Sequence, residues 1–186
     1  KKTYSYNPVP EDADASLKQH IIGIQGIIWT EYMQNDDRRD YQAFPRAIAL
    51  AETGWTQDSN KNFRNFCQRM VKDFQRMDIM NVKACRSFYD AYINTRVYND
   101  TLKAVLECFY PDAEIRYTTD GSNPNATSTL YAQPFVWNGA IHLKAAAFKK
   151  GKMLGKVTEK EVYANLITGK RYTTIPNCGW MNGDIF

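Results

Sequence analysis

The residues with the clearest capacity for chemistry are an indole and a carboxylate two positions apart, Trp29 and Glu31, which follow a mostly apolar segment. Side chains alternate along a β-strand, so these two would share one face with Gln25 and Ile27. An indole packs on the apolar side of a sugar ring, and a carboxylate accepts hydrogen bonds from sugar hydroxyls. The spacing is compatible with a carbohydrate-binding pair, but by itself it favours a core tryptophan beside a solvated loop residue.

Other residues that could do chemistry have simpler interpretations. Residues 120–125 superficially suggest a calcium loop, but the later bidentate glutamate is missing and a hairpin turn accounts for them. Asp36 and Asp37 have polar surroundings that would not raise a pKa, so we interpret them as solvated charges rather than paired catalytic carboxylates. The 4 cysteines form no Cys-x-x-Cys pair and only 2 histidines accompany them, which argues against a zinc site. We expect no metal and no cofactor.

Three regions with different periodicity must position these residues. The first, residues 1–93, contains the β-branched segment 21–29, which predicts a buried strand, and then a helical pattern. One face of that helix would carry Phe44, Ile48, Ala51 and Trp55. A second helix is predicted around residues 63–77, where an apolar stripe flanked by Lys and Arg is typical of packing on a core.

The second region, residues 94–167, alternates apolar and polar residues, and turn residues such as Asn138-Gly139 separate the runs. Short strands at this spacing predict a small antiparallel β-sandwich. The third region, residues 168–186, has no strong periodicity, and we interpret it as a linker or the start of a truncated further module.

Composition limits the function classes. The chain has 186 residues, 44% of them hydrophobic, which is ample for one or two small cores and excludes disorder. Its net charge is only +4 and its basic residues form no arm or cluster, so we expect no nucleic-acid partner. No stretch approaches the roughly 20 apolar residues of a membrane span. The polar opening Lys1-Lys2-Thr3-Tyr4 is unlike a signal peptide, so the chain is either cytoplasmic or a mature piece of something longer.

Two segments together resemble glycoside hydrolase family 20, the β-N-acetylhexosaminidases built on a (β/α)8 barrel. Residues 23–31 follow the pattern Gly-x-Gln-x-x-x-Trp-x-Glu of the family's last barrel strand, and Phe44-Pro45-Arg46 and Ala51-Glu52 follow in the next helix. Residues 117–124, Tyr-Thr-x-Asp-Gly-x-x-Pro, resemble the immunoglobulin-like C-terminal domain of chitobiases and bacterial hexosaminidases. The resemblance implies an α+β chain, with a partial (β/α)8-barrel remnant of one strand plus helices, followed by a small antiparallel Ig-like β-sandwich.

The resemblance also implies a function. Trp29 would form one wall of the subsite for a terminal N-acetylglucosamine or N-acetylgalactosamine, and Glu31 would bind the hydroxyls at ring positions four and six. Gln25 would be a packing group behind them. The family's hydrolysis is substrate-assisted and retaining, and it needs an adjacent Asp-Glu pair that this chain lacks. We therefore expect the C-terminal portion of a hexosaminidase, inactive alone and with no catalytic residue of its own.

The partners implied are glycans that end in N-acetylhexosamine, bound by the complete protein, and the exposed barrel remnant could also associate with another chain. The family is often exported, so we expect a periplasmic or extracellular parent protein. Two non-catalytic alternatives stay open. A carbohydrate-binding module would expose Tyr131 and Trp137. An oligomerisation or interdomain spacer would expose an apolar patch on the helix around residues 63–77.

Overall fold

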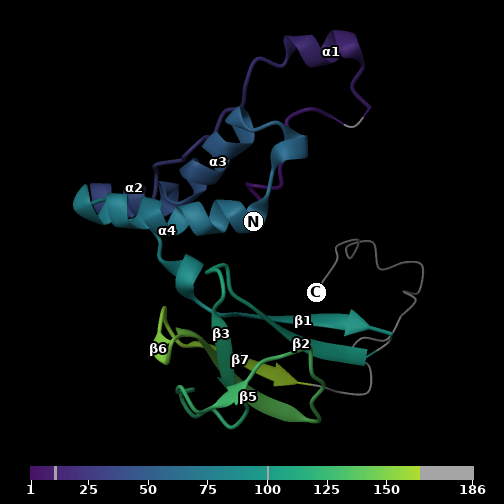
Figure 1. Cartoon of the computed structure of the whole chain (residues 1–186), viewed down its shortest axis with the longest axis vertical. Helices are drawn as coiled ribbons and strands as arrows, with labels where there is room; N and C mark the ends of the chain where they lie inside the picture. Colours follow the sequence, from purple (N-terminus) through teal and green to yellow (C-terminus); the bar gives the residue numbers. More distant parts are fainter. Residues whose placement is uncertain (11, 100, 164–186) are drawn as a thin grey trace.

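The computed structural model describes residues 1–10, 12–99 and 101–163, arranged as a helical half and a β-sheet half (Figure 1). The predicted linker or further module, residues 168–186, lies outside the described residues, as does Cys178. In chain order the elements are α1 Ala15–His20, α2 Asp36–Ala43, α3 Arg46–Trp55, a short 3-10 turn Asp58–Asn60, α4 Phe63–Ile79, a second 3-10 turn Ser87–Tyr89, β1 Tyr92–Tyr98, β2 Thr101–Glu107, β3 Glu114–Thr118, β4 Thr129–Leu130, β5 Ala140–Lys149, β6 Lys152–Met153 and β7 Thr158–Tyr163.

The helix α4 forms the centre of the helical half, as its apolar stripe predicts. The Asn62 side chain caps its first turn by accepting a hydrogen bond from the backbone N–H of Asn65, at 2.9 Å. The stripe is buried against the N-terminal segment and α3. Its buried members are Phe66, Cys67, Met70, Phe74 and Met77. Because this face is already covered, α4 lacks the exposed apolar patch that the spacer interpretation requires.

The helix α3 uses only part of its predicted apolar face. Phe44 and Ile48 pack against the core, but Ala51 and Trp55 are exposed. The buried positions are instead Ala49 and Thr53. The Thr53 hydroxyl lies 3.0 Å from the carbonyl oxygen of Ala49 one turn earlier, which satisfies its polar atom inside the core. The side of α3 that carries Trp55 therefore has no partner among the described residues.

Two antiparallel sheets form the other half. The β1–β2 hairpin is one sheet, and the second has the order β4-β3-β5, with β6 and β7 both paired to β5. A shared core lies between the sheets and is built from alternating residues. Its buried members include Ala104, Leu106, Ile115, Leu143 and Ala145. The α+β class and the small antiparallel sandwich predicted from the sequence are confirmed.

Aromatic side chains join the two halves. Phe63 at the start of α4 packs edge-on against Phe109 at 5.7 Å between ring centroids, and Phe109 lies 5.0 Å from Tyr92 of β1. Arg64 adds an ion pair with Asp112 in the loop between β2 and β3. The sandwich therefore contacts α4, the central helix of the helical half, and Figure 1 shows this loop beneath α4.

The predicted buried strand at residues 21–29 is absent from the structure, and this expectation was wrong. Residues 21–30 have neither strand nor helix, and most of their side chains face solvent, with Ile22 99% exposed. A strand exists only through hydrogen bonds to a neighbouring strand, and a buried one needs cover on both faces. The described residues place no strand beside this segment, so it lies extended on one side of α3 only.

Burial in the helical core gives one pH-dependent prediction. Desolvation raises the pKa of the Cys67 thiol to about 11, whereas an unfolded chain would release this proton near pH 8.5. The stabilisation is fully present below the unfolded pKa and is lost as the pH rises toward 11, because the folded state then holds a proton that the unfolded state has released. We expect the free energy of unfolding to fall by about 2–3 kcal/mol more in the wild type than in Cys67→Ala between pH 8 and 11.

Denaturant unfolding at several pH values would measure this difference. Cys85→Ala is the matched control, because Cys85 is also buried but hydrogen bonds from Ser87 and Tyr41 outweigh its burial and lower its pKa. Parallel pH profiles for the wild type and Cys67→Ala would contradict the prediction.

Candidate functional site

The helix α3 supports the segment that carries the predicted site. The Ile24 side chain packs on Gly54 so closely that a β-carbon at residue 54 would come within 3.3 Å of it. Leu50 of α3 lies in direct contact with Gly26 in the same way. These glycines allow the extended segment to approach the helix, which is the packing expected within a single βα unit.

Trp29 and Glu31 both lie at the end of this segment, exposed to solvent. The indole is 73% exposed, and Glu31 has no hydrogen-bond or ion-pair partner among the residues that the structure describes. A backbone hydrogen bond from the N–H of Met33 to the carbonyl oxygen of Thr30, at 3.0 Å, closes a turn that contains Glu31. Gln25 is exposed as well, so the described residues do not pack against it in the way the resemblance implies. Both predicted side chains are therefore free to contact a ligand.

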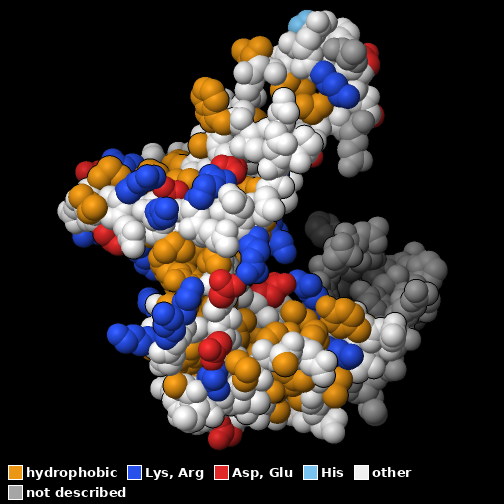
Figure 2. Space-filling model, viewed as in Figure 1, with side chains coloured by type: hydrophobic (Ala, Val, Ile, Leu, Met, Phe, Trp, Pro, Cys, Tyr) orange, Lys and Arg blue, Asp and Glu red, His pale blue; other side chains and the backbone are white. Residues whose placement is uncertain are grey.

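Other large apolar side chains in the same part of the chain are exposed as well. Figure 2 shows hydrophobic side chains gathered on the upper part of the molecule, around α1 and α3. The largest of them in this region are Leu17, Ile22, Ile27, Ile28, Trp29, Tyr32 and Trp55. Single exposed apolar residues are normal, but so many in one stretch and its supporting helix are typical of a surface that another part of a protein covers. The segment thus has the character of an interior strand without its neighbours.

A polar groove of about 640 Å³ opens beside the site, and the sequence patterns did not reveal it. The turn after Glu31 and the first turns of α2 form most of its wall, and Lys83 completes it from the segment after α4. Its lining residues are Tyr32, Gln34, Asn35, Asp37, Arg38, Tyr41 and Lys83. The sequence signal that could have indicated this groove was Tyr32 and Tyr41 on either side of a polar stretch. Only the tertiary structure brings Lys83 next to them.

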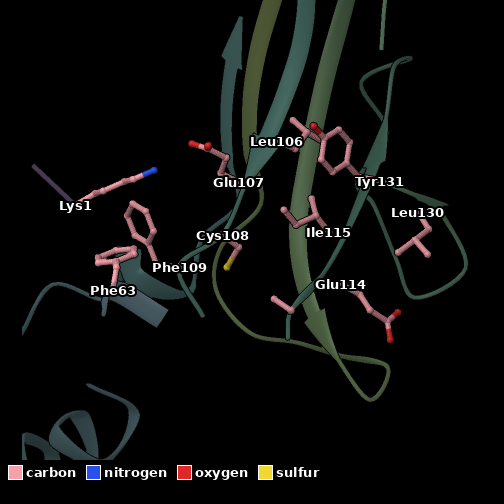
Figure 3. Close-up of a pocket in the computed structure, with 11 residues that line it drawn as sticks. Lys1, Phe63, Leu106, Glu107, Cys108, Phe109, Glu114, Ile115, Leu130 and Tyr131 are labelled. Atoms are coloured by element: carbon pink, nitrogen blue, oxygen red, sulfur yellow. The ribbon is translucent and has the colours of Figure 1, made fainter. Parts of the chain in front are cut away.

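A second cavity, of about 460 Å³, lies between α4 and the sandwich (Figure 3). Its walls are largely apolar and aromatic. Its two carboxylates, Glu107 and Glu114, point in different directions at opposite sides of the cavity. Each is already paired, Glu107 with Arg96 at 3.3 Å and Glu114 with Arg116 at 2.8 Å. Without convergent polar groups, this cavity is a packing gap at the joint between the halves rather than a site.

The aromatic residues that would support a binding module lie against the sandwich core. Tyr131 and Trp137 are half-buried, and both pack against the core between the two sheets. The Trp137 indole N–H is buried and has no hydrogen-bond partner among the described residues. These rings fill the sandwich and present no open aromatic platform, so the structure weighs against the binding-module alternative.

The structure adds two findings about other kinds of site. No group of three or more His, Cys, Asp or Glu side chains with the geometry for a metal ion occurs within residues 1–10, 12–99 and 101–163. In the same described part of the chain, none of the helices has the length and apolar character to cross a membrane.

Comparison with known proteins identifies the class to which this architecture belongs. Residues 1–58 match the catalytic domain of glycosyl hydrolase family 20, and residues 105–162 match a domain described as Fn3 associated. The first match contains Trp29, Glu31 and the supporting helix α3, and the second covers most of the sandwich. The two matches are consistent with a fragment of a glycosyl hydrolase family 20 protein, in which residues 1–58 correspond to part of the catalytic domain.

Individual relatives carry the name beta-hexosaminidase. A protein of Porphyromonas gingivalis with that name is 30% identical over 158 residues, which cover 82% of this chain and 20% of the relative. A beta-hexosaminidase of Vibrio furnissii is 40% identical over 55 residues, 29% of this chain and 9% of the relative. Beta-hexosaminidase B of Pseudoalteromonas piscicida is 35% identical over 57 residues, 30% of this chain and 7% of the relative. The chain spans a fifth or less of the length of these relatives.

Proposed function

We propose that this chain is the C-terminal portion of a β-N-acetylhexosaminidase, which removes terminal N-acetylglucosamine or N-acetylgalactosamine from glycans. The observation that carries the proposal is the exposed pair Trp29 and Glu31, on a segment packed against α3 and inside the family 20 match. The names of the relatives support the same activity.

The two side chains have complementary roles in this proposal. The Trp29 indole packs against the apolar face of the terminal sugar and forms one wall of its subsite. The Glu31 carboxylate, which has no protein partner among the described residues, accepts hydrogen bonds from the sugar hydroxyls at positions four and six. Together they bind and orient the ring, and neither of them transfers a proton or forms a bond to it.

The chemical step in this proposal needs groups from another part of the protein. The oxygen of the sugar's own acetamido group attacks the anomeric carbon, the bond to the leaving-group oxygen breaks, and that oxygen takes a proton from a glutamic acid. Water then opens the oxazolinium intermediate, so the configuration is retained. The glutamic acid and an adjacent aspartate that orients the acetamido group form the Asp-Glu pair missing from this sequence. We therefore expect the chain to be inactive alone.

The same proposal accounts for the exposed apolar side chains. In a closed barrel the segment at residues 21–29 would pair with strands on both sides, and this surface would be covered. By itself the chain would then tend to associate through the exposed barrel remnant. We also propose a periplasmic or extracellular location for the parent protein, as for many members of the family.

Hydrolysis of a chromogenic N-acetyl-β-glucosaminide tests the proposal. The 186-residue chain is compared with a longer protein that contains a complete family 20 catalytic domain ending in this chain. We expect turnover by the longer protein only. An inactive longer protein that still binds aminosugars would refute the enzymatic proposal and favour a binding module. Turnover by the short chain would refute the proposal that hydrolysis requires the Asp-Glu pair.

A further inference from the structure

The polar groove beside Glu31 has a defined construction. Tyr32 follows Glu31 directly, and the turn at residues 30–33 leads into α2. The Asn35 side chain accepts a hydrogen bond from the backbone N–H of Arg38, at 2.9 Å, and so fixes the start of that helix. A backbone hydrogen bond from Cys85 to the carbonyl oxygen of Phe44, at 3.0 Å, holds the segment that carries Lys83 against the end of α2. Three separate stretches of chain thus form one wall.

Charged groups in the groove are unpaired, in contrast to those next to them on α2. Arg39 makes ion pairs with both Asp36 and Asp40, at 2.9 and 3.2 Å. Asp37 and Arg38, which line the groove, have no ion-pair partner within the described part of the chain. The groove therefore offers a carboxylate acceptor and a guanidinium donor that make no ion pair or side-chain hydrogen bond to any described residue. Most of the other helix charges already have partners.

Two tyrosine rings add apolar faces to these polar groups. The Tyr32 side chain is 88% exposed and the Tyr41 side chain 42%. The guanidinium of Arg38 lies 5.6 Å from the centre of the Tyr41 ring, which places a donor beside one aromatic face. Rings of this kind, together with both donors and acceptors, suit a ligand that has an apolar face and many hydroxyl and amide groups. A simple anion or an apolar peptide would use only one part of this set.

We propose that this groove is an accessory sugar-binding position, which contacts an N-acetylhexosamine unit of the glycan other than the one that is cleaved. The inference rests on the proposed function, because it places the groove next to the terminal-sugar residues Trp29 and Glu31. The Tyr32 ring packs against the sugar. Asp37 accepts hydrogen bonds from its hydroxyls, and Arg38 donates to the carbonyl oxygen of its acetamido group. The position favours longer glycans over a single sugar.

Kinetics of the longer protein with two substrates test this position. The trisaccharide of β-1,4-linked N-acetylglucosamine can reach the groove, whereas N-acetyl-β-glucosaminyl fluoride, a single sugar with a small leaving group, cannot. We expect Tyr32→Ala to lower the ratio of kcat/KM for the trisaccharide to kcat/KM for the fluoride about tenfold. Arg38→Ala should lower the same ratio. Tyr163→Ala, which removes another exposed tyrosine, 61% exposed on β7, should leave both kcat/KM values unchanged.

The outcomes distinguish failure of the accessory sugar-binding position from failure of the proposed hexosaminidase function. An unchanged ratio in both groove variants, with normal thermal unfolding, would overturn the accessory position and leave the proposed function standing. An equal loss with both substrates would also overturn it, because Tyr32 would then act at the cleaved sugar. If the wild type hydrolyses neither substrate, the proposed function fails. Calorimetric titration with the trisaccharide then tests sugar binding in the groove. This proposal holds only if Tyr32→Ala weakens trisaccharide binding and Tyr163→Ala does not.

Discussion

Replacing Trp29 by alanine, in the longer protein with a complete family 20 catalytic domain, is expected to lower kcat/KM for a terminal N-acetylglucosaminide about 100-fold. Glu31→Gln is expected to have a similar effect. Truncation of the indole removes the aromatic wall, and the glutamine loses hydrogen bonds from sugar hydroxyls to a full negative charge. Hydrogen bonds to charged groups contribute about 1.5–3 kcal/mol each, which corresponds to a factor of roughly 10 to 150.

Matched variants separate binding from general damage. Tyr163→Ala removes an aromatic ring that is 61% exposed on β7, outside the barrel remnant, and Glu161→Gln neutralises an exposed carboxylate on the same strand. Both should keep kcat/KM within about twofold, because surface substitutions away from special features change little. If Trp29→Ala behaves like Tyr163→Ala, the assignment of the sugar wall is wrong. A drop in kcat and KM together would instead indicate relief of ground-state strain.

The largest expected effect on stability comes from Gly155→Ala, at the point where the chain enters β7. A β-carbon at this position would lie 2.6 Å from the carbonyl oxygen of Tyr89 and would also collide with the Asp90 carboxylate. The same stretch is fixed by a hydrogen bond from the backbone N–H of Lys156 to Asp90, at 2.8 Å. Neither side can move without breaking this contact, so we expect a loss of about 3 kcal/mol in the free energy of unfolding.

Gly23→Ala is the control for this substitution. A β-carbon at Gly23 meets nothing within 4 Å, so only the smaller conformational entropy of the unfolded chain changes. We expect a shift of less than about 1 kcal/mol, in the stabilising direction. Thermal and denaturant unfolding of both variants would measure the difference. Equal unfolding free energies for the two variants would show that the crossing of residues 89–90 over Gly155 is less tight than described.

Local pattern was sufficient for much of the fold. The stripe on α4 and the alternation in β2, β3 and β5 depend only on the helical and strand periods, and each apolar face met a core. The turn at residues 120–124 shows the same: the Asp120 side chain accepts a hydrogen bond from the backbone N–H of Ser122, and Gly121 adopts a positive φ of 80°. These features need no information from distant residues.

For the candidate site, too, some features follow from the sequence and others only from the tertiary structure. Sequence by itself determined that Trp29 and Glu31 form a candidate sugar-binding pair, since the residues around them resemble a family 20 segment and match its model. Only the tertiary structure decided that residues 21–30 do not form a strand, because strand hydrogen bonds require a neighbour. It also decided that Lys83 joins Tyr32 in one groove, since that contact depends on how the segment after α4 packs beside α2.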